Sequence, residues 1–206
     1  WVGRWAGWLA LAGGFRHAVM QLFPSFLHRL FAITMFSLAA RYTTMAGEWM
    51  IGGCEAKVFA WALVLGAWGE GVRGRWAYAW LLSGAATAFH PLVGGWMMIS
   101  IAFVALIQSM KRRDQIDWLN LCALACVIAG LAVALYGVWP AMQMSSGVAA
   151  DICEEAAAIY VVDRLPHHLL PSSFQESLVT RHLLAVIFCG VLYAALPSGS
   201  RRQRGL

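Results

Sequence analysis

Long apolar runs alternate with short polar segments along the chain. Six runs hold almost only hydrophobic residues and small residues: 31–40, 58–68, 76–89, 92–110, 118–139 and 183–196. A helix needs about 20 mostly apolar residues to cross a hydrocarbon layer of roughly 30 Å. The run 118–139 meets that length alone, 92–110 nearly does, and the others would have to borrow flanking residues or tilt. The pattern predicts an all-α fold, a multispan transmembrane helical bundle with about six spans.

Basic and acidic residues are concentrated in different connections between these runs. Lys and Arg gather in residues 69–75, 111–117 and 197–206, whereas the intervening connections carry acids and histidines. Cytoplasmic loops of membrane proteins retain Lys and Arg, so we place the basic segments inside and the others outside. The longest polar stretch, 141–181, is then an extracytoplasmic loop with one or two short helices.

Local signals predict the helices of this loop. Pro140 is expected to end the preceding span. Asp151 is expected to cap a helix, with Glu154 completing a capping box, and Pro166 to stop that helix. A second helix is expected to start from a serine cap at Ser172 or Ser173.

Composition leads to the membrane class by a separate route. Hydrophobic residues make up 61% of the 206 residues and charged residues only 12%, with 11 tryptophans among them. One soluble core of this size could not hide so much apolar surface. The net charge of +5 comes without the interleaved aromatic stripe that binds nucleic acid strands. We therefore expect membrane lipids as partners, and no nucleic acid.

The first thirty residues are less regular. Arg4, Arg16 and His17 interrupt the apolar character, and Pro24 would end or kink a helix running through it. We expect an incomplete span or an interfacial helix over residues 1–20. The chain has no initiator methionine and no secretory signal, so we expect residues 1–206 to be a single transmembrane domain that lacks upstream helices.

Two acids and a lysine surround a glycine pair where the second apolar run begins. Glu48 and Glu55 lie on either side of Gly52 and Gly53, and Lys57 follows. A structural role is open, because the dipole of a helix that starts here would favour an acid in its first turn. A functional role is equally open, because ionisable side chains at the start of a span are costly and usually face a partner or a cavity.

His90 occupies the short turn FHPLVGG between the third and fourth runs. A histidine before proline is most often a turn residue bonded to the backbone. A histidine side chain can also act as a base, as a hydrogen-bond donor to phosphate or as a metal ligand. The charge distribution places it on the same outer face as Glu55.

The string VVDRLPHHLLP gathers four chemically capable side chains within six positions: Asp163, Arg164, His167 and His168. Three readings are open for it. One histidine could join His90 or a carboxylate in binding a divalent metal, although no standard zinc spacing occurs. Arg164 and the histidines could instead bind a phosphate head group. The string could also be a solvated surface turn.

Three strings carry a resemblance to a known family: GGCEAKVFAWALVLGAW, ATAFHPLVGGW and YVVDRLPHHLLPSSF. In this order, within about residues 45–180, they resemble the recurring blocks of a family of uncharacterised polytopic bacterial inner-membrane proteins. The layout is similar to that of GT-C type membrane glycosyltransferases, whose multispan helices carry a catalytic carboxylate on an external loop and use polyprenyl-phosphate sugars. The resemblance implies a multi-pass protein of the bacterial inner (cytoplasmic) membrane.

These observations lead to one main expectation and two alternatives. We expect a periplasm-facing site in an enzyme of lipid-linked sugar chemistry, with Glu55, then Glu48 or Asp163, as base or metal ligand. The substrate phosphate would be held by the other polar side chains of the clusters: Lys57, His90, Arg164, His167 and His168. Glu55, His90 and at least one histidine of the 163–168 turn should then share one pocket. The alternatives are a transporter or channel-like protein with Glu55, Lys57 and His90 along a polar pathway, and a structural membrane subunit.

Overall fold

The computed structural model describes residues 1–44, 51, 53–111, 121–144 and 146–195. All regular elements within these residues are helical, which confirms the all-α class. The chain divides into two compact units. The first unit comprises Trp1–Ile33 and Met50–Val148, and the second comprises Thr34–Trp49 and Ala149–Leu206.

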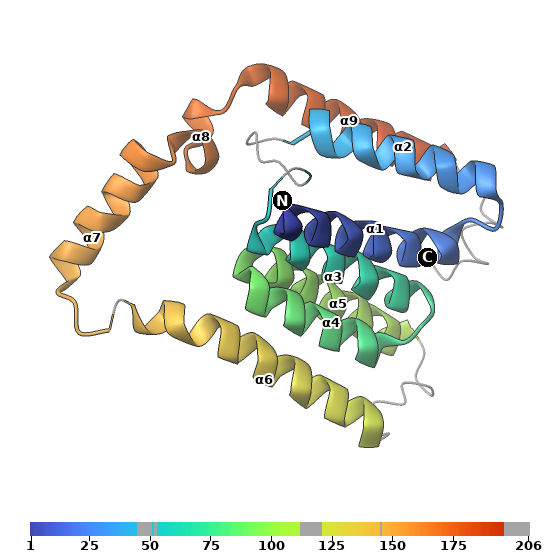
Figure 1. The fold of residues 1–206 in the computed structure, drawn as a ribbon, viewed down its shortest axis with the longest axis horizontal. Helices are drawn as coiled ribbons and strands as arrows, with labels where there is room; N and C mark the ends of the chain where they lie inside the picture. Colours follow the sequence, from blue (N-terminus) through green and yellow to red (C-terminus); the bar gives the residue numbers. More distant parts are fainter. Residues whose placement is uncertain (45–50, 52, 112–120, 145, 196–206) are drawn as a thin grey trace. The chain divides into compact units, whose positions relative to one another are not determined.

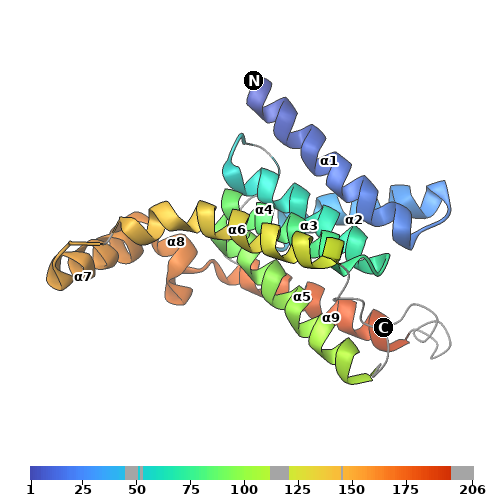
Figure 2. The same cartoon turned by 90° about the horizontal axis from the view of Figure 1, so that it is seen from below.

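The first unit is built around a pair of central helices. Its elements are α1 (Val2–Leu22), the start of α2 (Phe26–Tyr42), α3 (Ala56–Val72), α4 (Trp76–Phe89), α5 (Pro91–Lys111) and α6 (Leu121–Gln143). Helix α3 packs against α1 on one side and α4 on the other (Figure 1). Helix α4 also contacts α5, and α6 lies along it (Figure 2). The polar connections before α3 and after it therefore lie at opposite ends of this unit.

Glycines occupy the points where these helices approach most closely. A Cβ atom on Gly14 of α1 would collide with the carbonyl oxygen of Ala62 in α3. Between α4 and α6, a Cβ atom on Gly84 would collide with the backbone of Gly130. Small residues at helix interfaces are typical of membrane proteins, because lipid gives helices no hydrophobic reason to associate and close packing must hold them together.

Helix α4 is short and lies among three other helices. Its 14 residues extend about 21 Å, less than the roughly 30 Å of a hydrocarbon layer. Its buried hydroxyls are satisfied within the helix, since Ser83 donates to the carbonyl of Ala79 (2.8 Å) and Thr87 to that of Ser83 (2.9 Å). The indole of Trp80 donates to the carbonyl of Val127 in α6 at 3.2 Å. Hydrogen bonds within α4 and to α6 thus account for these three polar side chains.

Helix α6 is the candidate membrane span. Among the described residues it alone is long and apolar enough to cross a membrane, and the apolar part of α5, Pro91–Ile107, is shorter. Only 11% of its most apolar window is buried, so it is not the enclosed core helix of a soluble protein. Large apolar side chains are exposed along its length: Leu124, Ile128, Leu131, Leu135 and Trp139. One candidate span is thus present, and the topology of about six spans stays a prediction.

Several helix boundaries follow the sequence pattern, and one does not. Helices α4 and α5 coincide with the runs 76–89 and 92–110 to within a residue. Helix α1 is continuous and ends before Pro24, where Arg29 donates to the carbonyl groups of Phe23 (2.7 Å) and Pro24 (3.0 Å). The prediction that Pro140 ends a helix is wrong, because α6 continues to Gln143. Pro140 costs the helix one hydrogen bond, to the carbonyl of Tyr136, and only three helical residues follow it.

The second unit contains the end of α2 and a series of short helices before a longer one. These are α7 (Ala150–Ala158), the π-helical segment Ile159–Arg164, α8 (Pro166–Leu169), a 3-10 turn (Pro171–Ser173) and α9 (Glu176–Ala195). The Nδ1 atom of His182 in α9 donates to the carbonyl of Thr43, just after α2, at 2.7 Å. Short helices therefore occupy much of residues 141–181, and the outward placement of this segment stays a prediction.

The predicted caps in this unit are wrong. The N-cap of α7 is Ala149, without a side-chain bond, and Asp151 lies inside the first turn, where an acid still favours the helix dipole. Helix α9 begins at Glu176, so the Ser172 and Ser173 side chains, within or at the end of a 3-10 turn, are too early to cap it. Pro166 does separate two helices, because the preceding one ends at Arg164.

Candidate functional site

The start of α3 carries an ion pair between two predicted site residues. Glu55 is the N-cap residue, in an extended conformation, and its carbonyl accepts from the amide of Val58 at 3.0 Å. Its side chain does not cap the helix. The carboxylate instead lies with Oε2 at 3.3 Å from Nζ of Lys57. The backbone of Glu55 therefore begins the helix, while its carboxylate is not used as a helix cap.

Burial divides this pair unequally. The Lys57 side chain is 15% exposed and the Glu55 side chain 42%. An ammonium group at the start of an apolar helix needs a counter-charge, because burial of an unpaired ion is costly. A half-exposed pair adds only about 0–1 kcal/mol to stability. The pair thus adds little to stability, and the Glu55 carboxylate stays accessible to solvent.

His90 links α4 to α5 at the same end of the unit. Its backbone amide donates to the carbonyl of Ala86 at 2.8 Å, which closes α4. Its ring Nδ1 accepts from the amide of Val93 at 3.4 Å, a long hydrogen bond that caps the start of α5. A neutral ring in this arrangement carries its proton on Nε2, which can donate to a ligand. His90 therefore has a turn-forming role and one remaining donor.

Two stacked rings place His90 and the Glu55–Lys57 ion pair at the same end of the first unit. Phe59 of α3 and Phe89 of α4 stack with their ring centroids 5.7 Å apart. These two residues follow Lys57 and precede His90 in the chain, respectively. The α3 start and the α4–α5 turn thus share one end of the first unit, which we call the Glu55 end: Glu55, Lys57 and His90. Glu48 lies outside the described residues.

The remaining predicted site residues belong to the second unit. Asp163 and Arg164 are exposed in the π-helical segment, and the Arg164 guanidinium lies 6.0 Å from the ring centroid of Tyr160. The rings of His167 and His168 in α8 are 4.0 Å apart. A π-helix is rare and often occurs at functional sites. The string is a compact polar group within its own unit, and a shared pocket with the Glu55 end stays a prediction.

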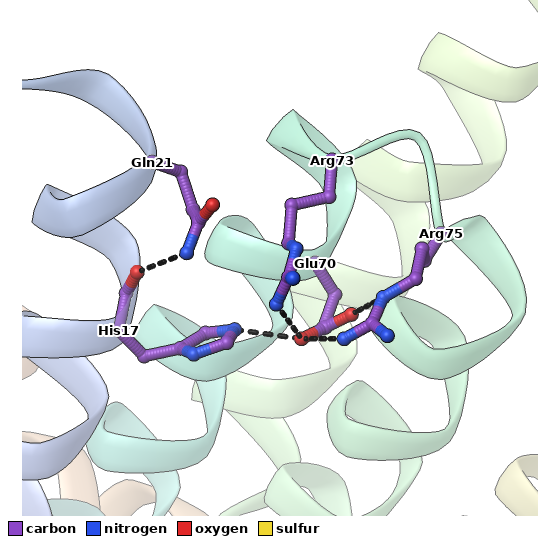
Figure 3. A network of polar contacts seen from close by, with 5 residues as sticks. All are labelled: His17, Gln21, Glu70, Arg73 and Arg75. Carbon is purple, nitrogen blue, oxygen red and sulfur yellow. Dashed lines mark hydrogen bonds and ion pairs between the residues drawn. The ribbon is translucent and has the colours of Figure 1, made fainter.

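The most connected polar group in the described residues was missed by the sequence reasoning. Glu70, in the last turn of α3, is buried, with 7% of its side chain exposed. Its Oε1 lies 2.6 Å from Nε2 of His17 and accepts from Nη2 of Arg75 at 2.8 Å (Figure 3). Its Oε2 accepts from Nε of Arg75, and Arg73 Nη1 lies 3.8 Å from Oε1. We call these four residues the Glu70 cluster.

Two glycines allow this cluster to form. A Cβ atom on Gly69 would meet the His17 ring at 2.5 Å and the Ala18 backbone at 3.1 Å, so only glycine lets α1 bring His17 to Glu70. Gly74 has φ +77°, a conformation that other residues rarely adopt. It reverses the chain so that the amide of Arg75 donates to the carbonyl of Glu70 at 2.9 Å. The turn thus folds the Arg75 side chain back onto the carboxylate.

Glu70 and Arg75 both lie in residues 69–75, beyond the apolar run 58–68. The hydrogen bond from Arg75 lowers the pKa of Glu70 below its ordinary value of 4.5, burial opposes this shift, and the His17 bond adds to it. The same hydrogen bond raises the pKa of Arg75. Glu70 is therefore ionised at neutral pH and well compensated, which suits an anchor between α1 and α3 better than an acid or base.

A sequence signal for this cluster exists in retrospect. Glu70 is the single acid in the basic connection 69–75, with arginines three and five positions later. The arginines were interpreted only as an orientation signal, and His17 only as an interruption of an apolar run. Its partner on α1 is 53 positions away, and spacing within one helix gives no access to such a contact.

The wider comparisons leave the function to be argued from these residues. Within the described residues, no three His, Cys, Asp or Glu side chains are grouped as a metal ion would require. Comparisons of the chain with protein-family models, with curated proteins and with solved structures gave no match. The resemblance to polytopic inner-membrane proteins stays a prediction.

Proposed function

We propose that this chain is a multi-pass protein of the bacterial inner membrane, and that its Glu55 end binds a polyprenyl-phosphate-linked sugar on the extracytoplasmic side and takes part in transfer of that sugar. The membrane part of the proposal is supported by the exposed apolar surface of α6 and by the glycine contacts between helices. The orientation is supported by the arginines at the opposite end of α3.

The single observation that carries the site is the Glu55–Lys57 pair. A half-exposed carboxylate is held 3.3 Å from a mostly buried ammonium group at the start of an apolar helix. Lys57 supplies positive charge to a phosphate, and the Nε2–H of His90 supplies a further donor at the same end. Glu55 supplies a base within reach of solvent. A phosphate-bearing ligand with a hydroxyl acceptor matches this set of groups.

The proposed reaction is a displacement at the anomeric carbon. The acceptor hydroxyl gives its proton to the Glu55 carboxylate while its oxygen forms a bond to that carbon. The bond from the anomeric carbon to the phosphate oxygen breaks, and the electron pair leaves with the polyprenyl phosphate. Lys57 and His90 stabilise the charge on the departing phosphate.

The alternatives have less support from the described residues. A transporter needs polar groups near the middle of the membrane, usually at broken helices. The described side chains of α5 and α6 carry no charge, and Ser83 and Thr87 of α4 bond to their own helix. A purely structural subunit would not need an accessible carboxylate beside a buried lysine. The polar residues favour a site at one end of the first unit.

A double substitution tests this proposal. Glu55→Gln with Lys57→Met removes both charges and keeps side-chain volume, and Glu155→Gln with Arg4→Met is the matched control on exposed residues. Each purified variant is reconstituted into vesicles containing a radiolabelled mannosyl polyprenyl phosphate, with water in the place of the acceptor hydroxyl, and bound lipid and released sugar are counted. We expect the double variant to lose about a hundredfold of the turnover, because one contact to developing charge accounts for roughly 2–4 kcal/mol.

The outcomes separate function from folding. Melting temperature is measured for every variant, and the isosteric single change Glu55→Gln replaces the double variant if the latter is unstable. Loss of turnover with an unchanged melting temperature supports the proposal. Equal turnover in the double variant and its control, or no binding of the labelled lipid by the unaltered protein, would overturn it.

A further inference from the structure

The α3–α4 turn holds more positive charge than its anchoring role requires. Arg75 directs Nε and Nη2 to Glu70. Arg73 Nη1 stays at 3.8 Å from the same carboxylate, beyond hydrogen-bond distance. The two guanidinium groups and one carboxylate leave a net charge of +1, and a protonated His17 would raise it to +2. Part of this charge is therefore available to something outside the chain.

The donors of this turn are accessible and oriented. The Arg73 and Arg75 side chains are 41% and 47% exposed. A guanidinium has five N–H donors in a planar fork, and Glu70 engages only two from Arg75. The side-on bond to a buried carboxylate fixes the plane of Arg75, while Arg73 keeps its own fork (Figure 3). Two arginine forks beside each other suit the oxygen atoms of a phosphate group.

Aromatic side chains indicate where such a phosphate would come from. The Arg75 guanidinium lies 5.2 Å from the ring centroid of Tyr78, which is exposed, and Trp68 is exposed on the last turns of α3. Tyrosine and tryptophan next to basic residues are typical of the head-group level of a membrane. This step rests on the proposed membrane location of the first unit. It favours a lipid head group over a phosphate dissolved in water.

We propose that Arg73 and Arg75 bind the phosphate of an anionic phospholipid in the cytoplasmic leaflet, and that Glu70 is a positioning residue that holds Arg75 for this contact. Anionic lipid attracts basic residues next to the membrane by electrostatics alone. The site differs from such a general attraction, because one of its two arginines is fixed by a buried partner.

This difference makes Glu70→Gln the informative variant. Removal of the carboxylate raises the net charge of the turn by one, so general electrostatic attraction predicts tighter lipid binding. Loss of the side-on bond leaves Arg75 without its fixed orientation, so the site proposed here predicts weaker and less selective binding. The two explanations thus give changes of opposite sign in the same measurement.

The test counts lipids that stay bound to the purified full chain. The protein is incorporated in nanodiscs of an equimolar mixture of phosphatidylglycerol and phosphatidylcholine, and retained lipids are identified by native mass spectrometry after release. We expect Arg73→Gln or Arg75→Gln to lower the retention of phosphatidylglycerol about fivefold each, the effect of roughly one charge at a membrane surface. Arg4→Gln is the matched control, because Arg4 is exposed at the opposite end of α1.

Further measurements identify the source of the phosphate and distinguish failure of this inference from failure of the proposed function. Glycerol 3-phosphate in solution should not displace the retained lipid; displacement at low concentration would mark a soluble phosphate ligand and overturn the lipid assignment. Retention in the arginine variants equal to that of Arg4→Gln, or an increase in Glu70→Gln, would overturn the site. Labelling of cysteines placed at Gln115 and Ser173 reports the topology separately. Failure of insertion there refutes the proposed function, whereas correct insertion without lipid retention refutes only this inference.

Discussion

The two ends of α3 carry the same kinds of charge in opposite circumstances. At the start, Glu55 is 42% exposed and is paired at 3.3 Å with Lys57. At the end, Glu70 is 7% exposed and receives His17 and Arg75 together. Both carboxylates lie next to an apolar helix body, yet one is fully engaged by the fold and the other is not. The difference separates a carboxylate that holds helices together from one that remains available to a ligand.

The two carboxylates differ in how much of their hydration they lose when the protein folds. Glu70 has exchanged its hydration for charge-assisted hydrogen bonds, which are about twice as strong as neutral ones. Glu55 keeps much of its hydration, so its bond to Lys57 adds little to stability. We therefore expect substitutions at the Glu70 end to change stability and substitutions at the Glu55 end to change turnover.

The largest stability effect should come from moving α1 away from α3 without touching a charge. A Cβ atom at Gly14 would collide with the backbone of Ala62, whereas the neighbouring Gly13 has open space around it. We expect Gly14→Ala to lower the free energy of unfolding by about 3 kcal/mol, as overpacking against backbone does. Gly13→Ala is the control and should be neutral or stabilising by up to about 1 kcal/mol. Thermal unfolding in detergent compares the two, and equal midpoints would contradict the close α1–α3 contact.

Replacement of Glu70 should have the next largest effect. Glu70→Gln removes the negative charge and one of the two acceptor oxygens, which weakens the charge-assisted bonds from His17 and Arg75. Because both partners are partly exposed and can regain water, we expect a loss of about 2 kcal/mol, near the value of a hydrogen bond to a charged group. Denaturant unfolding measures it. His17→Asn should give a smaller loss, and a stability equal to that of the unaltered protein in both variants would show that the cluster is not an anchor.

Acid should weaken the Glu70 end specifically. The pKa of Glu70 is lowered from its ordinary value of 4.5, mainly by the Arg75 hydrogen bond. A lowered pKa in the folded state means that the stabilisation is complete above about pH 4.5 and is lost as the pH falls through the folded-state value. The melting temperature should therefore decline below pH 4.5. In Glu70→Gln this decline should be shallower, and identical acid profiles would assign it to other carboxylates.

The smallest stability effect is expected at the Glu55 end. Glu55→Gln should change the free energy of unfolding by less than about 1 kcal/mol, because a half-exposed ion pair contributes little. The same thermal measurement used for Glu70→Gln provides the comparison. A loss at Glu55 as large as that at Glu70 would mean that the pair is structural and would remove the reason to place a ligand there.

The sequence allowed the helical class and most helix positions to be predicted, because apolar runs and helix-breaking positions are local properties. The α4 and α5 boundaries and the break before Pro166 are examples. Cap identity was less accessible, since Asp151 and Ser172 are good caps only if the helix starts directly after them, and both helices start elsewhere. The polar residues of the Glu55 end were found because charge at the start of an apolar run is also a local feature.

The Glu70 cluster could not be found in this way. It depends on a contact between α1 and α3 that Gly69 permits, and on the reversal at Gly74 that returns Arg75 to the carboxylate. Neither requirement has a periodic signature. The arginines of residues 69–75 are sufficiently explained by an orientation signal, so their local pattern does not indicate that they pair with Glu70.

A paired comparison of Glu55→Gln and Glu70→Gln tests the central claim most directly. Both changes replace a carboxylate by an amide of the same shape, one at each end of α3, and both variants are measured for melting temperature and for release of sugar from a radiolabelled mannosyl polyprenyl phosphate in vesicles. We expect a crossed result: Glu70→Gln unfolds earlier and still releases the sugar when folded, whereas Glu55→Gln keeps its melting temperature and loses the release. If both variants lose stability and turnover in the same proportion, the two ends of α3 do not have the separate roles assigned to them.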